Sequence, residues 1–200
     1  MRLRPYGPAA WLVDGIDDPI GWAGGIRRAA LDGVVEVVPA ETTVLVRCAR
    51  ERRDDVGERL ADVAPEERPI ESEPIIVPVR YDGDDLDEVA ASTRLSIAEV
   101  VARHSEPIYR VRFCGFSPGF GYLGGLDPAL ELPRRDVPRT RVPAGAVAIA
   151  AHYSAVYPAP SPGGWHLIGS TDLAMWDPSR PEPSLLTPGA TVSFRPMDVT

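Results

Sequence analysis

Residues 109–125 read YRVRFCGFSPGFGYLGG, and this stretch decides the fold of the second half of the chain. Its first part alternates Tyr109, Val111 and Phe113 with polar arginines, which is the period of a half-buried β-strand. The glycines and the proline that follow break the strand with a tight turn. Short strands separated by such turns are typical of β-barrels and β-sandwiches.

The same pattern continues on both sides of this stretch. We predict further strands over residues 147–151, 165–170, 173–176 and 191–195. Toward the N-terminus, residues 84–105 predict two short helices, and Ser96 with Glu99 forms a capping box for the second. A helix pair of this size suggests DNA binding, but the segment is acidic, which argues against that function.

The first 75 residues alternate strands and helices. Apolar and β-branched runs predict strands over residues 10–13, 34–38, 43–47 and 75–79, with helices starting at Asp18–Pro19 and at Asp54 or Asp55. The order β-α-β-β-α-β is the split pattern of ferredoxin-like domains. Residues 64–74 are rich in proline and glutamate and predict a linker. We therefore expect a small α/β domain over residues 1–74 and a β domain over residues 75–200.

Composition excludes several classes of function. The net charge of −8 argues against nucleic-acid binding, and all 21 basic residues are arginines. Without lysine, the chain cannot form a Schiff base or a P-loop that uses its own lysine. The two cysteines fit a reducing compartment, and we expect no metal site. No signal peptide and no membrane-length apolar run is found, so we expect a cytoplasmic protein.

Two familiar motifs overlap in the glycine-rich segment, and chemistry argues against both. Gly115–Gly119 matches the G-x-S-x-G nucleophile elbow, but Pro118 has no N–H to offer an oxyanion. Gly119–Gly124 matches the dinucleotide motif G-x-G-x-x-G, but no long helix can begin in the sequence that follows. We expect a tight loop whose aromatic residues Phe116, Phe120 and Tyr122 border a ligand cleft.

Charged side chains supply the other candidates. Arginines cluster near residues 134–141, and guanidinium groups bind carboxylates or phosphates, so an anionic substrate is one interpretation. The alternative is a solvated loop paired with local acids such as Glu131 and Asp136. Three histidines, His104, His152 and His166, are candidates for proton transfer near neutral pH, although a structural role is also open for each.

Together these segments resemble one family. The motifs are His104 with Tyr109-x-Val111, the run Gly115–Leu126, Pro133-Arg134-Arg135, Pro138-Arg139, Val142-Pro143-Ala144-Gly145, Val156-Tyr157-Pro158 and Ser161–Gly169. They resemble the family of the prokaryotic 5-oxoprolinase B subunit, also called allophanate hydrolase subunit 1. That family includes the Kip inhibitor of a sporulation kinase and resembles half of the carboxyltransferase region of urea amidolyase.

This resemblance implies a small N-terminal α/β domain and a C-terminal cyclophilin-like β-barrel. It also implies a carboxyltransferase partner of the C-subunit type, an A subunit, and ATP-dependent opening of 5-oxoproline to glutamate by the complex, with ATP belonging to the complex. On this basis we predict His104, Arg134 and Arg135 as catalytic residues. The predicted cleft consists of Phe116, Pro118, Gly119, Phe120, Arg139, Arg141, Pro143, Gly145, Tyr157, Gly163, Gly164 and Trp165.

Two alternatives remain at this stage. One is a Kip-type binding module that inhibits a histidine kinase, and the other is a carboxyltransferase part of a urea carboxylase–allophanate hydrolase system. The chain also departs from the family pattern over residues 146–154. Alanines replace two glycines at Ala148 and Ala151, Ala146 replaces a serine, and an amide is lost before Ser154. If this strand lines the site, close approach of the backbone is restricted and hydrogen-bond donors are missing, so we expect an effect on substrate identity or on activity itself.

Overall fold

The computed structural model describes residues 1–66 and 73–197, and the chain divides into two compact units, Met1–Glu71 and Ser72–Thr200. Each unit has its own apolar core. The middle of the predicted linker, residues 67–72, lies outside the described residues. No described helix has the length and apolarity needed to cross a membrane.

The first unit is a four-stranded antiparallel sheet with two helices. The strand order is β1-β2-β4-β3. Its elements are β1 (Arg2–Pro5), η1 (Gly7–Ala9), β2 (Ala10–Asp14), α1 (Pro19–Arg28), β3 (Val34–Pro39), β4 (Val44–Cys48), η2 (Arg50–Arg52) and α2 (Arg53–Leu60). Helix α1 begins where predicted, with Asp18 as N-cap and proline in the first turn. Val44 and Val46 of β4 and Ile26 of α1 are buried in one core cluster, so burial of apolar area holds the helix on the sheet.

The predicted β-α-β-β-α-β order of this unit is wrong in its last strand. Strand β5 (Ile75–Val79) joins the sheet of the second unit, where it pairs in parallel with β13 (Thr191–Pro196). The edge beside β2 is occupied instead by the N-terminal strand β1, which sequence reasoning missed. A continuous apolar strand such as IIVPV fits any sheet that buries it, so sequence order alone does not choose the sheet.

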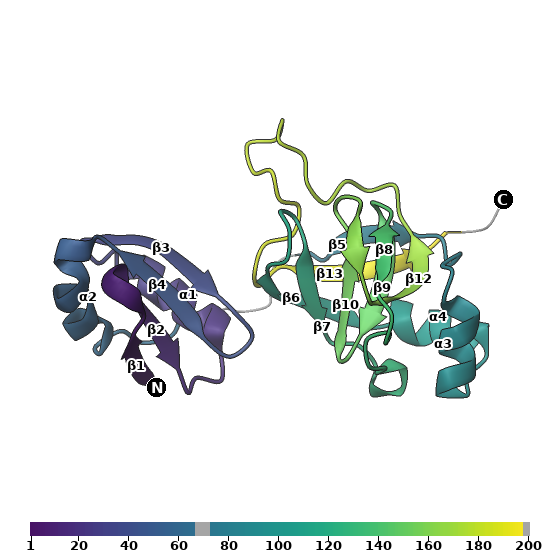
Figure 1. Ribbon diagram of the computed structural model, residues 1–200, viewed down its shortest axis with the longest axis horizontal. Helices are drawn as coiled ribbons and strands as arrows, with labels where there is room; N and C mark the ends of the chain where they lie inside the picture. The colour runs from purple at the N-terminus through teal and green to yellow at the C-terminus, as the bar shows by residue number, and fades with distance from the viewer. Residues whose placement is uncertain (67–72, 198–200) are drawn as a thin grey trace. The chain divides into compact units, whose positions relative to one another are not determined.

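The second unit is built on a seven-stranded sheet that nearly closes into a barrel (Figure 1). The strand order is β12-β9-β10-β7-β6-β13-β5, and its two edges meet where the Arg80 and Ser170 backbones exchange hydrogen bonds of 2.9 and 2.7 Å. The predicted barrel is thereby confirmed in outline. Its remaining elements are α3 (Leu86–Thr93), α4 (Ile97–Ser105), β6 (Ile108–Cys114), β7 (Gly121–Gly124), η3 (Pro128–Leu130), β8 (Arg139–Val142), β9 (Ala146–Ala150), β10 (Tyr153–Val156), β11 (Ser161–Gly163) and β12 (His166–Ser170).

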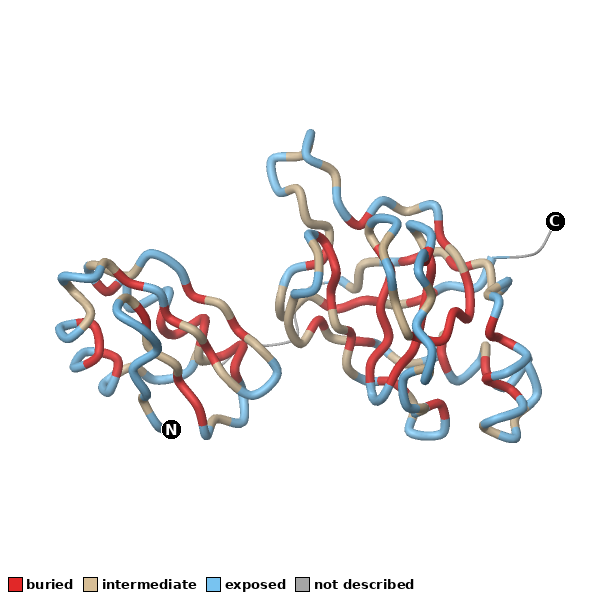
Figure 2. The backbone as a smooth tube through the Cα atoms, in the orientation of Figure 1, coloured by how far each residue is buried: buried red, intermediate tan, exposed pale blue. Residues whose placement is uncertain are grey.

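Alternation along the strands divides the barrel sheet into two apolar faces. Val147 and Ile149 of β9 belong to the core that also holds the helices, whereas Ala146, Ala148 and Ala150 lie in a second cluster rich in aromatic rings. Figure 2 shows the buried residues concentrated along the barrel strands. Short β8 and β11 pair with each other as a separate two-stranded sheet.

Helices α3 and α4 follow β5, and the capping box predicted for α4 is present. The strand predicted over residues 173–176 is not formed. Its last residue, Trp176, pairs only as an isolated bridge with Ser184, and this pairing is too short to make a strand.

Candidate ligand-binding pocket

A small open pocket of about 70 Å3 lies on the aromatic side of the second unit. It is lined by Phe116, Phe120, Tyr122, Arg134, Tyr157, Pro162, Gly163, Gly164 and Trp165. Two wider surface depressions of about 620 and 390 Å3 belong to the first unit, and no predicted site residue lines them. The aromatic pocket is therefore the candidate site, because chemistry-bearing side chains converge there.

The loop between β6 and β7 forms one wall of the pocket. Phe116 has a φ of +69° and is 58% exposed, an unusual combination for a bulky residue. Gly119 has a φ of +82°, and a Cβ there would lie 2.8 Å from the Cβ of Trp176. The prediction of a tight glycine-dependent loop is confirmed, and the loop presents Phe116 at the pocket.

Tyr157 and Trp165 also line the pocket, and both pack against the ring of Phe120. Phe120 makes edge-on contacts with both rings, at centroid distances of 5.2 Å to Tyr157 and 5.6 Å to Trp165. A Cβ at Gly163 would overlap the Tyr157 hydroxyl, so only glycine lets β11 approach this close. Burial raises the pKa of the Tyr157 phenol, which therefore keeps its proton at neutral pH.

Arg134 supplies the positive charge of the pocket. Its side chain is exposed at the lining, and its charge acts on the Tyr157 phenol. Across residues 1–66 and 73–197, Arg134 has no ion-pair partner. An exposed guanidinium of this kind, set among aromatic rings, can bind a small planar anion such as a carboxylate.

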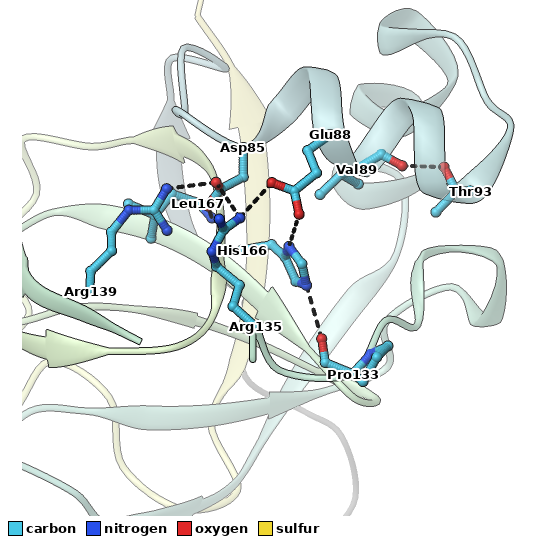
Figure 3. Close-up of polar contacts among 9 residues, drawn as sticks. All are labelled: Asp85, Glu88, Val89, Thr93, Pro133, Arg135, Arg139, His166 and Leu167. Carbon is cyan, nitrogen blue, oxygen red and sulfur yellow. Dashed lines mark hydrogen bonds and ion pairs between the residues drawn. The ribbon is translucent and has the colours of Figure 1, made fainter. Parts of the chain in front are cut away.

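The neighbouring arginines point elsewhere. Arg135 donates to Asp85 at 2.7 Å and to Glu88 at 2.6 Å, and Arg139 donates to the same Asp85 oxygen at 2.6 Å (Figure 3). The partner acids thus come from the start of α3 and not from Glu131 or Asp136, which lie closer in sequence. The ion-paired alternative holds for Arg135 and Arg139, so these two side chains are not free to bind an anion.

Asp85 is the centre of this cluster. Its side chain is 3% exposed, and its second oxygen accepts from the Leu167 N–H at 2.7 Å. Burial by itself raises the pKa of this carboxyl, but hydrogen bonds from Arg139 and the Leu167 N–H, with the charge of Arg135, bring it below the ordinary value. Asp85 is therefore ionised at neutral pH.

His104, predicted as catalytic, lies in the core and does not line the pocket. It is fully buried, with the Tyr81 hydroxyl 2.8 Å from Nδ1 and the Ser154 hydroxyl 2.8 Å from Nε2. Burial lowers the pKa of His104 to about 3, so the ring is neutral at physiological pH. A ring without exposed surface cannot touch a substrate in this structure, and its hydrogen bonds indicate a structural role.

Five further residues of the predicted cleft lie outside the pocket lining. Pro118, Gly119, Arg141, Pro143 and Gly145 do not line the pocket. The Gly145 N–H donates to the Tyr157 carbonyl at 2.8 Å, which supports the wall from behind.

Sequence reasoning left Pro162 and the acids Asp85 and Glu88 out of the predicted site. Pro162 could have been included because it directly precedes the glycine pair Gly163–Gly164. Nothing in the sequence indicates that Asp85 and Glu88 contact residues 135–139.

The residues that depart from the family pattern do not line the pocket, and Ala151 among them is exposed. Ala146 and Ala148 pack in the same cluster as Phe120 and Trp165 but do not line the cavity. Ser154 is buried and bound to His104. The substitutions at Ala146 and Ala148 therefore change the packing around the aromatic residues, and none of the substituted positions lines the pocket.

The pocket does not fit a nucleotide. Its volume of about 70 Å3 is far below the roughly 300 Å3 and more of sites for larger ligands, and Arg134 is the one cation among the described residues that line it. In the described part of the chain, no three His, Cys, Asp or Glu side chains gather to hold a metal. The arrangement can bind and orient a small acid with a planar ring or amide.

Comparison with known proteins gives consistent results. The family described as carboxyltransferase domain, subdomain C and D, matches residues 1–186. The chain is 44% identical over 182 residues to the 5-oxoprolinase B subunit of Escherichia coli O157:H7, covering 88% of this chain and 84% of that protein. It is 43% identical over 143 residues to the 5-oxoprolinase B subunit of Bacillus subtilis (strain 168), covering 70% of this chain and 59% of that one.

Solved structures support the fold. A crystal structure of TTHA0988 superposes with a TM-score of 0.85 at 36% identity and covers 100% of this chain and 41% of its own. The Kluyveromyces lactis urea amidolyase superposes with a TM-score of 0.72 at 18% identity, covering 98% of this chain and 15% of its own, which bears on fold alone. This chain thus corresponds to less than half of each of these two longer proteins.

Proposed function

Because the chain belongs to the carboxyltransferase domain family of subdomains C and D, we propose that it is the B subunit of a 5-oxoprolinase. The complex opens the lactam ring of 5-oxoproline to glutamate at the expense of ATP. It acts together with a C-type carboxyltransferase partner and an A-type partner. We place the complex in the cytoplasm, because the two cysteines of this chain are free and cytoplasmic thiols are kept reduced.

One observation supports this function most strongly: the Arg134 guanidinium, which has no ion-pair partner among the described residues, stands in an aromatic pocket of small volume. 5-Oxoproline is a flat five-membered ring that carries one carboxylate. Arg134 would bind that carboxylate with charge-assisted hydrogen bonds, and the rings of Phe120, Tyr157 and Trp165 would hold the lactam by its faces and edges.

The role of this chain is to bind and orient the substrate. Opening an unactivated lactam is unfavourable, and phosphorylation of its oxygen supplies a physical reason for ATP. The nucleotide and the attacking water are therefore assigned to the partner subunits, since the pocket of this chain does not fit a nucleotide. The protonated Tyr157 hydroxyl can donate a hydrogen bond to the lactam oxygen.

The test is an assay of the assembled complex. We would co-express this chain with its A-type and C-type partners and measure glutamate formed from 5-oxoproline and ATP. We expect glutamate only when this chain is present, and Arg134→Ala should raise the KM about tenfold to a hundredfold, as expected for loss of a charged hydrogen bond.

Arg141→Ala is the matched control, because Arg141 is an exposed arginine of the same cluster that does not line the pocket. It should leave KM within twofold of the wild-type value. Partner subunits that open 5-oxoproline equally fast without this chain would disprove the proposal.

A further inference from the structure

We infer that Asp85 is a positioning residue that holds the arginine segment, residues 134–139, against β12 and thereby places Arg134. This inference rests on the proposed function of the same pocket. Asp85 lies just before α3, and it does not line the cavity itself. Its influence would pass through the residues bonded to its carboxylate.

Each partner of the Asp85 carboxylate lies next to a lining residue. Arg135 follows Arg134 directly, and Leu167 lies two positions after Trp165. Arg139 begins β8 and pairs in register with Gly163 of β11. One buried carboxylate therefore connects the arginine segment to β12, which Trp165 directly precedes, and through Arg139 to β11, which contains Gly163.

Backbone bonds complete the connection. The Arg135 N–H donates to the Gly164 carbonyl at 2.8 Å, and the Asp85 N–H donates to the Leu167 carbonyl at 2.9 Å. Residues 134–138 are otherwise outside any strand, so the backbone there has no sheet to fix it. The ion pairs of Asp85 with Arg135 and Arg139 fix the backbone there instead. The direction of the Arg134 side chain therefore depends on how its neighbour Arg135 is held.

Glu88 and His166 extend the cluster on its outer side. Glu88 accepts from Arg135 at 2.6 Å, and the Nε2–H of His166 donates to the Pro133 carbonyl at 2.9 Å (Figure 3). Pro133 precedes Arg134 directly. The cationic residue of the pocket is thus anchored on both sides, by His166 before it and by Asp85 and Glu88 after it.

Charge balance explains why Arg135 and Arg139 have a structural role while Arg134 remains available to a ligand. Arg135 and Arg139 carry two positive charges, and Asp85 and Glu88 carry two negative charges, so these four side chains are neutral together. A substrate carboxylate gains little by displacing Asp85 from Arg135 or Arg139, because that would leave the buried Asp85 charge uncompensated. Arg134 lies outside this balance and remains available for the anion.

The experiment is a double-mutant cycle in the assembled complex, with KM and kcat measured for 5-oxoproline. Asp85→Asn keeps the shape of the side chain and removes its charge. We expect a rise in KM on the order of tenfold with kcat changed less than twofold, because misplacing a binding group weakens binding of substrate and transition state alike. In the Arg134→Ala background, Asp85→Asn should change KM less than twofold.

Asp172→Asn is the matched control. Asp172 also pairs with an arginine, at 2.8 Å from Arg80, but its side chain is 84% exposed and it lies away from the pocket lining. Its KM should stay within twofold of wild type. Losses from Asp85→Asn and Arg134→Ala that multiply, or an unchanged KM in Asp85→Asn alone, would overturn the positioning role.

If Asp85→Asn does not fold, a second variant tests the same inference. Glu88→Gln weakens the same anchor of Arg135 at a half-exposed side chain, and it should raise KM about threefold, again only while Arg134 is present. If the wild-type complex makes no glutamate, the proposed function fails. Calorimetric titration of 5-oxoproline into the same full-length chains then decides the role of Asp85, and a wild-type chain that binds none overturns that role too.

Discussion

Backbone conformation at single residues limits the stability of this chain. Ala151 has a φ of +49°, a left-handed conformation that costs an L-residue about 1 kcal/mol, and it stands at a position where the family pattern has glycine. Ala151→Gly should therefore raise the free energy of unfolding by about 1 kcal/mol, measured by urea denaturation. Ala150→Gly, at a buried strand position, is the comparison and should destabilise. Equal effects of both changes would contradict this explanation.

His104 couples folding to acidity through one buried ring. Its pKa of about 3 lies below the ordinary value of 6.5, so between these two pH values the unfolded chain is protonated at His104 and the folded chain is not. Stability is therefore retained above pH 6.5 and falls as pH drops toward 3, by up to about 1.4 kcal/mol per pH unit from this residue.

Denaturation between pH 6.5 and 5 measures this effect. His104→Gln keeps a polar side chain that does not titrate, so its stability should fall less steeply over that interval, even if the variant is less stable throughout. Parallel pH profiles of the variant and the wild type would contradict a buried neutral histidine.

Between elements, the close approach of β11 to the Tyr157 side chain sets the shape of the pocket. A Cβ at Gly163 would overlap the Tyr157 hydroxyl, whereas a Cβ at Gly164 would find its nearest neighbour at 3.6 Å. Gly163→Ala should cost about 1–3 kcal/mol of unfolding free energy and weaken 5-oxoproline binding. Gly164→Ala should stay within about 0.5 kcal/mol of the wild type. Thermal unfolding of both variants tests the difference, and equal losses would refute it.

The position of each element also shows what its local sequence encodes. Ser96 and Glu99 form a capping box at the start of helix α4, and the helix forms where predicted. Strand β5 was predicted in place but assigned to the wrong sheet, because its partner β13 lies more than a hundred residues later in the chain. Short β8 and β11 have little pattern of their own and exist through pairing with each other.

On the scale of the chain, the second unit contains its own cores, its closing strand pair and the whole pocket. We therefore expect residues 73–200, expressed alone, to fold cooperatively and to retain 5-oxoproline binding within threefold of the full chain. Circular dichroism on heating and calorimetry would measure this. A broad, non-cooperative transition would show that the first unit is needed for folding.

The amino-acid sequence by itself determined features that depend on neighbours in the chain: the cap of α4, the glycine-dependent loop at Gly119 and the family motifs. The alternation predicted for β6 holds at Tyr109 and Val111 but is wrong at Phe113, because a register shift after Val111 turns that ring toward the aromatic cluster. Only the tertiary structure decided which arginine is available to a ligand. Arg134 and Arg135 are adjacent and identical in type, yet Asp85 and Glu88 from α3 pair with one and leave the other in the pocket. Likewise, His104 has the right chemistry for catalysis, but burial in the core removes it from any ligand. Charge pairing and burial depend on groups far apart in sequence, and folding alone brings those groups together.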